Sequence, residues 1–289
     1  MSLKSEMAWK KWSGVAAQCP ICGSALLSGA GGLTCGQGHH FDLSRQGSVQ
    51  LMPGSSKASP YDASLFAARR RMLALGLFTP ALEAALPLME KAVPPGRLWV
   101  DAGCGEGWAT AFLHDRLPGR TALGLDLAAP GIRMAAASWG GEILWTVSDL
   151  ARLPLQDGAA QAVVNLLSPA HYGEFRRVLG EEGLLVKWIP GSGHLEQLRQ
   201  AAGIPLAEES RALAFFHKNC HSLGLKRIVA TIKVREEDLP AAVAMAPFTQ
   251  HRRQQALEAL AGETNLSLTS DLYLAWGHVK DKKEASEPV

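Results

Sequence analysis

Val100-Asp-Ala-Gly-Cys-Gly-Glu-Gly107 is the stretch that decides the fold, because it connects an apolar, strand-like run to the beginning of a helical one. Glycines at such a junction let the backbone pass close to a ligand, and a helix N-terminus favours an anionic group such as a carboxylate or a phosphate. The dinucleotide form of this loop, G-x-G-x-x-G, would need glycine at position 108, where the chain has Trp108. The loop therefore predicts a ligand-binding turn and disfavours NAD.

Short apolar segments alternate with helical runs on both sides of this loop. The strand-like segments cover 98–101, 122–126, 143–147, 162–167 and 184–189. Strands that are buried on both faces are continuously apolar, and alternation with helices implies a mainly parallel sheet. The sequence therefore predicts a doubly wound α/β domain. Two further strands, 227–234 and 266–276, enclose a helical stretch, 239–260, and are expected to form an edge hairpin with a helical insertion.

Two acidic residues follow the next strands of this domain. Asp126 closes the second strand, where a carboxylate can accept hydrogen bonds from both hydroxyls of a ribose, and Asp149 follows the third, where it suits an adenine amino group. The glycine loop and both acids should meet at one edge of the sheet. A nucleoside with a carboxylate end fits all three, which describes S-adenosylmethionine.

A cluster of cysteines and histidines precedes this domain. Cys19-Pro-Ile-Cys22 brings two thiolates into one turn, and Cys35-Gly-Gln-Gly-His39 supplies a third sulfur and an imidazole. Zinc is bound tetrahedrally by such sets, and so short a segment rarely folds without a metal. Spacing favours His39 as the fourth ligand, with the adjacent His40 as the alternative.

Length and composition agree with a globular protein of more than one unit. The chain has 289 residues, of which 47% are hydrophobic and 19% charged, and a formal net charge of +2 that neither requires nor excludes a nucleic-acid partner. We expect a zinc-binding ribbon over 1–53, a linker and linking helices over 54–96, the main domain over 97–279 and a disordered tail over 280–289. No window reaches the roughly 18–20 apolar residues of a membrane span, so we expect a cytoplasmic protein with no membrane partner.

Several motifs taken together resemble one enzyme family. They are Cys19-Pro-Ile-Cys22, Cys35-x-x-x-His39, Phe41-Asp42, Ala68-Arg69-Arg70, Asp101-Ala-Gly-Cys-Gly-Glu-Gly107 and Pro190-Gly-Ser-Gly-His194-Leu195. As a group they resemble the 23S rRNA (guanine-N1)-methyltransferases over nearly the whole chain. The resemblance implies a Rossmann-like class I methyltransferase sheet with a small N-terminal zinc ribbon, a hairpin of 23S rRNA as substrate, and an association with dimers.

The resemblance also implies which residues bind the metal and the cofactor. Zinc would be held by Cys19, Cys22, Cys35 and His39. By the resemblance, S-adenosylmethionine would be contacted by Phe78, Gly103, Cys104, Gly105, Glu106, Gly107, Asp126 and His194. Asp101 and Asp149 are added as candidate contacts by their positions at the ends of strands. Arg69 and Arg70 are candidate contacts to RNA phosphates.

Residues 165–169, where the substrate base is expected, depart from the family pattern and offer no plain general base. N1 of guanine carries a proton at neutral pH, so a group nearby should help to remove it. His171 and Glu174 are the candidates by position. Two other functions stay open: a small-molecule methyltransferase of the same fold, and a zinc-ribbon RNA-binding protein without catalytic activity.

Overall fold

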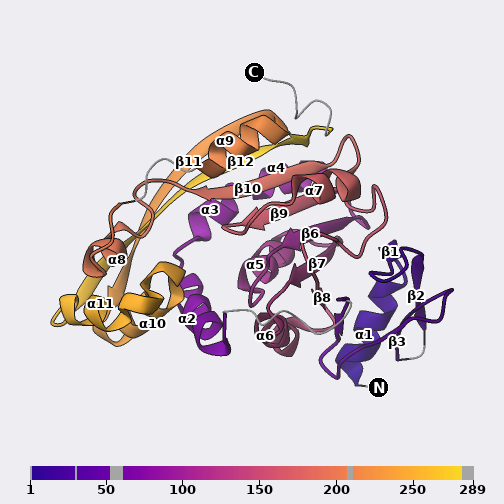
Figure 1. Ribbon diagram of the computed structural model, residues 1–289, viewed down its shortest axis with the longest axis horizontal. Helices are drawn as coiled ribbons and strands as arrows, with labels where there is room; N and C mark the ends of the chain where they lie inside the picture. The colour runs from indigo at the N-terminus through magenta and orange to yellow at the C-terminus, as the bar shows by residue number, and fades with distance from the viewer. Residues whose placement is uncertain (1, 30, 53–60, 207–210, 282–289) are drawn as a thin grey trace.

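The computed structural model describes residues 2–29, 31–52, 61–206 and 211–281 (Figure 1). The predicted tail from 282 onward, and residues 54–60 of the predicted linker with Lys57, lie outside the described residues. The described part contains a four-stranded sheet near the N-terminus and a large eight-stranded sheet.

The large sheet has the predicted doubly wound architecture. Its strand order is β11-β12-β10-β9-β6-β7-β8-β5. The central strands β6 (Leu98–Ala102), β7 (Thr121–Asp126), β8 (Leu144–Val147), β9 (Ala162–Leu166) and β10 (Leu184–Pro190) are parallel. The expected edge hairpin is also present: β12 (Asn265–Val279) runs antiparallel to both β10 and β11 (Cys220–Arg235). The doubly wound α/β domain predicted from the alternation of strands and helices is confirmed, and its strand order is that of the Rossmann-like sheet implied by the resemblance.

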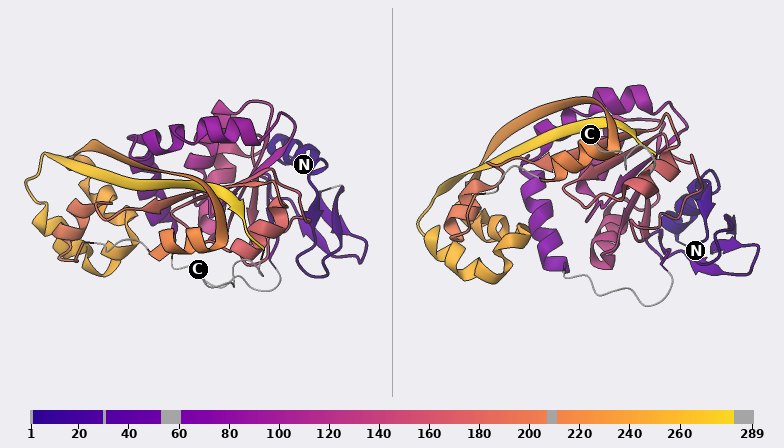
Figure 2. Two further views of the ribbon diagram at one scale, coloured as in Figure 1. Left: turned by 90° about the horizontal axis from the view of Figure 1, so that it is seen from above. Right: turned by 45° about the horizontal axis from the view of Figure 1, so that its top comes forward.

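Helices cover the sheet on both faces (Figure 2). One hydrophobic cluster joins Trp99 of β6 and Trp145 of β8 to helices on one side, whereas Val100 of β6 belongs to the second cluster. Successive side chains of a strand point to opposite faces, so continuously apolar strands can fill two cores at once. The helices that follow the central strands are α5 (Trp108–Arg116), α6 (Ala129–Trp139), α7 (Tyr172–Leu179) and α8 (Glu196–Ala201).

The linking helices predicted within 54–96 include two short ones, α3 (Thr79–Glu83) and α4 (Leu86–Ala92). Pro87 lies in the first turn of α4. It has no N–H to donate, and its ring would clash with the carbonyl of Glu83, four residues earlier, in an uninterrupted helix. The preceding helix α2 (Ala63–Ala74) packs against α10 (Leu239–Met245) of the insertion between β11 and β12, which continues through η2 (Pro247–Arg252) and α11 (Arg253–Ala259). The insertion is preceded by η1 (Glu236–Asp238), and α9 (Arg211–Asn219) leads into β11.

The N-terminal module begins with a helix that the polar first residues did not suggest. This helix, α1 (Leu3–Trp12), is capped by the Ser2 hydroxyl and buries Ala8 and Trp12 one turn apart. The small antiparallel sheet follows, with β1 (Ala17–Gln18), β2 (Ala25–Gly29), β3 (Gly32–Cys35) and β4 (His40–Asp42).

β5 (Ser48–Gln50), expected with the ribbon, pairs in parallel with β8 of the large sheet. Val49 and Leu51 are buried in the core under that sheet, and the Leu51 N–H donates to the Val147 carbonyl at 2.9 Å. Val49 and Leu51 therefore belong to the core of the large sheet. The N-terminal module is joined to that sheet through the pairing of β5 with β8.

Among the described residues, no single helix is long and apolar enough to cross a membrane. One pair of helical segments, 63–74 and 79–92, reaches the required length and apolar character together, but the two segments are bent by 75° relative to each other.

Candidate functional site

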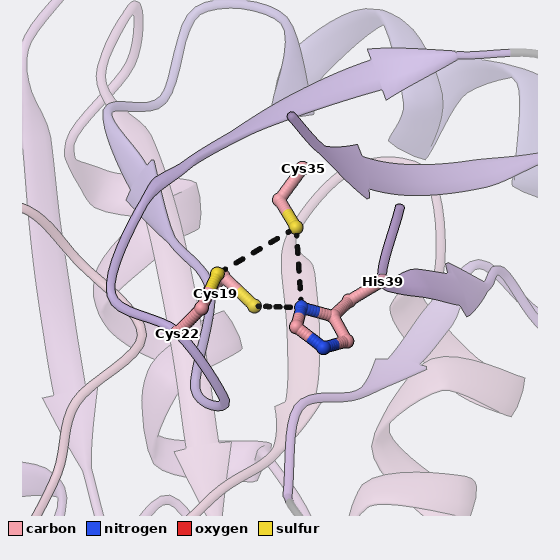
Figure 3. Close-up of side chains that lie close together, drawn as sticks. All are labelled: Cys19, Cys22, Cys35 and His39. Atoms are coloured by element: carbon pink, nitrogen blue, oxygen red, sulfur yellow. Dashed lines mark hydrogen bonds between the residues drawn. The ribbon is translucent and has the colours of Figure 1, made fainter. Parts of the chain in front are cut away.

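The four predicted metal ligands converge between the turn after β1, the end of β3 and the beginning of β4 (Figure 3). Their ligand atoms all lie within 4.8 Å of one another. The Sγ atoms of Cys22 and Cys35 are 3.7 Å apart, and His39 Nδ1 is 3.6 Å from Cys19 Sγ and 3.3 Å from Cys35 Sγ. Tetrahedral zinc with ordinary bond lengths gives ligand separations of about 3.8 Å for two sulfurs and about 3.5 Å for sulfur and nitrogen. The four residues therefore fit a zinc ion.

The structure separates the two adjacent histidines. His39 points toward the sulfurs, whereas His40 Nδ1 lies 2.8 Å from the Thr34 hydroxyl and its Nε2 lies 3.1 Å from an Asp42 oxygen. Hydrogen bonds from Ser24 lower the pKa of Cys22 to about 6, which favours the thiolate form that zinc requires.

A cavity of about 640 Å³ opens at the carboxyl ends of the parallel strands. Most of the predicted cofactor residues line it: Phe78, Asp101, Gly103, Cys104, Gly105, Glu106, Asp126, Asp149 and His194. Gly107 does not line the cavity. It has a φ of +82°, and a Cβ there would lie 2.5 Å from the Trp145 ring, so this glycine serves the turn and its packing.

Two buried carboxyl groups beside the glycine loop have oxygens without a partner. Asp101 is 2% exposed; one of its oxygens accepts the Thr110 hydroxyl at 2.6 Å, and the other has no hydrogen-bond partner among the described residues. Burial raises the pKa of Asp101 to about 7. Glu106 is equally buried and also has one oxygen without a partner, and burial raises its pKa. Unpaired buried carboxyl oxygens fit a cationic ligand group, such as the ammonium of S-adenosylmethionine.

Asp126 is held rigidly at the end of β7. Its two oxygens accept the backbone N–H groups of Gly105 at 2.9 Å and of Ala128 at 2.7 Å. Burial raises the pKa of Asp126, while these N–H donors oppose the shift. Each carboxylate oxygen can accept more than one hydrogen bond, so both remain able to accept from ribose hydroxyls. Asp149 accepts the Ala151 N–H at 2.9 Å and lies in the same cavity.

The consecutive arginines of α2 face three different partners, as a rotation of about 100° per residue requires. Arg69 lies over the rings of Tyr61 and Phe66, at 5.9 and 6.0 Å, and lines the cavity. Arg70 donates to the Glu106 carbonyl at 2.8 Å and thereby braces the glycine loop. Arg71 forms a bidentate ion pair with Asp238, at 2.7 and 3.0 Å.

The prediction that Arg69 and Arg70 contact RNA phosphates stays a prediction: Arg69 lines the cavity, whereas Arg70 has further partners within the protein. Arg70 also donates to the Ser138 hydroxyl at 3.0 Å and lies 4.9 Å from the Trp139 ring. These contacts tie α2 to α6 and leave Arg70 little freedom to reach an external phosphate.

The two candidate bases lie in different places. His171 lines the cavity just before α7. Glu174 does not line it; its carboxylate accepts the Leu153 N–H at 2.9 Å and pairs with Arg177 at 2.7 Å. Glu174 therefore joins α7 to the segment after β8, and the expectation of a catalytic role at this position is not supported by its contacts.

A buried polar network behind the cavity was missed by sequence reasoning. Lys187 in β10 is 4% exposed; its ammonium donates to the Asn165 side-chain oxygen and to the Ser168 carbonyl, the latter at 2.8 Å. Asn165 in turn donates to the Ala102 carbonyl at 2.6 Å. The network fixes the loop after β9, where Leu167 has a φ of +53°. The signal in the sequence is a lysine within an otherwise apolar strand.

The far wall of the cavity also escaped prediction. It is formed by Arg199 of α8 and by residues 245–248, which run from the last residue of α10 into the beginning of η2. Nothing in the local pattern of these segments indicates a ligand, because they reach the cavity only through the packing of the insertion.

The sheet topology and the carboxylate-lined cavity define the class of protein: a class I S-adenosylmethionine-dependent methyltransferase that carries a zinc ribbon. A family model described as the RlmA N-terminal zinc ribbon matches residues 17–60, and a methyltransferase-domain model matches residues 100–183. The chain belongs to the 23S rRNA (guanine-N1)-methyltransferase family.

Three relatives carry this assignment. A 23S rRNA (guanine(748)-N(1))-methyltransferase of Streptomyces fradiae is 30% identical over 245 residues, covering 81% of this chain and 86% of the relative. A protein of Micromonospora griseorubida, provisionally named a 23S rRNA (guanine-N(1)-)-methyltransferase, is 30% identical over 84% of this chain and 89% of its own length. YxjB of Bacillus subtilis (strain 168), with the same provisional name, is 37% identical over 63% of this chain and 67% of its own length.

Proposed function

We propose that the protein transfers the methyl group of S-adenosylmethionine to N1 of a guanine in 23S rRNA. The observation that carries this proposal is that Asp126, which is predicted to bind the ribose, lines the same cavity as the glycine loop and the loop after β9. The relatives named for this reaction align with most of the chain. The cavity supports S-adenosylmethionine as the cofactor, and the names of the relatives support N1 of guanine as the acceptor atom.

Positioning is the main contribution that this chain can make to the reaction. When bound, S-adenosylmethionine supplies an electrophilic methyl group that is displaced in line. Asp126 would hold the ribose, and the loop braced by Lys187 and Asn165 would form the wall against which the guanine is placed. Alignment of two reactants can lower a barrier by up to about 7–11 kcal/mol.

The N1 proton needs an acceptor, and His171 is the candidate that the cavity retains. To reach the cavity, the target base must leave its stack, which favours a loop nucleotide over a paired one. We accordingly propose a hairpin loop as the substrate, a homodimer as the assembly and the cytoplasm as the location. We also propose the domain limits 1–53, 54–96, 97–279 and 280–289. Residues 48–50 belong to the first of these segments but pair with β8 of the third.

Methylation of a hairpin transcript of 23S rRNA tests the proposal directly. The target guanine is replaced by inosine, which keeps the N1 proton, or by adenine, whose N1 has none. We expect 1-methylguanine by mass spectrometry, methylation of inosine, and no methylation of adenine, with a rate that rises with pH until the base or the guanine has titrated. Labelled methyl groups on adenine, on cytosine or only on small acceptors would overturn it.

A further inference from the structure

Charges of both signs line the cavity. Asp101, Glu106 and Asp126 line it from the glycine loop and from the ends of β6 and β7. Arg199 lines the same cavity from α8, and its guanidinium lies 4.3 Å from the centre of the Phe248 ring. The cavity therefore combines carboxyl groups with a guanidinium that comes from a separate element.

The guanidinium of Arg199 has few hydrogen-bond partners among the described residues. Its guanidinium donates one hydrogen bond to a described residue, to the Pro205 carbonyl at 3.5 Å, and its Nε is buried without a partner among the described residues. No ion pair joins it to a carboxylate of the described chain, in contrast to Arg71 with Asp238 and Arg227 with Asp271. A partly buried guanidinium without a counter-ion is costly, and the cost is removed when an anion binds.

His194, which interacts electrostatically with Arg199, is not a second cation beside it. It is 8% exposed, its Nδ1 has no partner among the described residues, and its ring lies 5.8 Å from that of Phe78. Burial lowers the pKa of His194 to about 4, and the charge of Arg199 acts in the same direction against the attraction of Asp271. The imidazole is therefore neutral near pH 7, and Arg199 is the cation of this wall.

We propose that Arg199 binds the α-carboxylate of S-adenosylmethionine. The amino-acid part of this cofactor carries an ammonium and a carboxylate on the same carbon. The ammonium fits the unpaired oxygens of Asp101 and Glu106, and repulsion from the same groups turns the carboxylate toward a cation. Stacking on Phe248 fixes the plane of the guanidinium, which can then meet a carboxylate with two parallel hydrogen bonds.

Arg69, the other arginine of the cavity, is a poorer partner for this carboxylate. Its nearest charged neighbours include Glu106 and Asp126, which already offset its charge. A second anion at this place would also approach those carboxylates. The assignment of Arg199 rests on the proposed function, since it presumes that this cavity holds the cofactor.

Binding calorimetry with three ligands tests the assignment. The ligands are S-adenosylmethionine, decarboxylated S-adenosylmethionine, which keeps the ammonium, and 5′-methylthioadenosine, which lacks the amino-acid part. Wild-type protein should prefer S-adenosylmethionine to the decarboxylated compound by about 10- to 100-fold, the range for hydrogen bonds to charged groups. In Arg199→Met this preference should fall to about twofold or less, with unchanged affinity for the other two ligands, and Arg199→Lys should restore part of it.

Arg252→Met is the matched control. Arg252 donates to the carbonyls of Ala202 and Gly203 at the end of α8, at 3.2 and 3.1 Å, and does not line the cavity. Its replacement removes hydrogen bonds that hold the end of α8 but leaves the guanidinium of Arg199 in place. The preference for S-adenosylmethionine over the decarboxylated compound should therefore persist. Zinc content and melting temperature establish that each variant is folded.

Three results would overturn the assignment. Equal weakening of all three ligands in Arg199→Met would make the residue structural. Unchanged preference with weaker RNA binding and a smaller salt dependence would assign the guanidinium to an RNA phosphate. Failure of wild-type protein to bind any of the three ligands would refute the proposed function itself. That outcome is distinguishable from an error in the assignment of Arg199 alone, in which wild-type protein binds the cofactor and Arg199→Met keeps the preference.

Discussion

Cofactor affinity should depend on pH through Asp101. Its buried carboxyl group has a pKa of about 7 in the free protein, well above the ordinary 3.8. Below pH 7 the group holds a proton and cannot pair with the ammonium of the cofactor. Because binding favours the ionised form, the affinity falls as the pH falls, by up to tenfold per pH unit.

The magnitude follows from the ionised fraction. With a pKa of 7, about 9% of Asp101 is ionised at pH 6 and about 76% at pH 7.5, so the dissociation constant should be about eightfold larger at pH 6. His194, with a pKa of about 4, does not titrate in this range. An α-amino group has a pKa of about 7.7–8.0, so the cofactor's own ammonium is half deprotonated there, which sets the upper limit of the measurement.

Calorimetry with S-adenosylhomocysteine from pH 5.5 to 7.5 measures this dependence in wild type, Asp101→Asn and Thr110→Val. The asparagine variant should bind about 10- to 100-fold more weakly at pH 7.5 and lose most of the pH dependence. The Thr110 hydroxyl lowers the pKa of Asp101, so Thr110→Val should move the midpoint to higher pH. Wild-type binding that is flat between pH 6 and 7.5, or a slope that is equally steep in Asp101→Asn, would refute the pairing of Asp101 with the ammonium; a smaller residual slope is expected from Glu106, whose pKa is also raised.

Three further outcomes are expected. Elemental analysis should find one zinc per chain, which Cys22→Ser or Cys35→Ser removes while cofactor binding is retained; full zinc in both variants would contradict the ligand set. Asp126→Ala should weaken S-adenosylmethionine by about 1.5–3 kcal/mol by calorimetry, with RNA affinity nearly unchanged, and an unaltered dissociation constant would place the ribose elsewhere. Lys187→Met leaves the carbonyl of Ser168 and the amide oxygen of Asn165 without their donor, so denaturant unfolding should show a loss of about 2–4 kcal/mol, and a loss below 0.5 kcal/mol would mean that the network contributes little.

Sequence reasoning succeeded where the chemistry is local in the chain. The ligands Cys19 to His39 come from two turns whose spacing is visible in the sequence, and the structure also decides between His39 and His40. Asp126 was found because parallel strands bring their carboxyl ends to one edge, whatever the remaining topology.

Prediction failed where the direction of a side chain depends on packing between distant segments. Nothing in the sequence indicates that Arg70 hydrogen-bonds Ser138 of α6 or that Arg69 lies over the Tyr61 ring, because both contacts depend on how α2 packs. Arg199 meets Phe248 only because the insertion folds back over α8. No periodicity within either segment encodes that contact.

Because β5 covers the outer edge of β8, the zinc site should also protect the large sheet from edge-to-edge aggregation, which is distinct from the proposed homodimer. β5 pairs with the outer side of β8, and the chain reaches it directly from the ribbon. An uncovered strand presents a row of free N–H and C=O groups that other chains can extend. Chelation of the metal should loosen the ribbon, uncover β8 and start edge-to-edge aggregation, which light scattering would register before the cofactor cavity is lost.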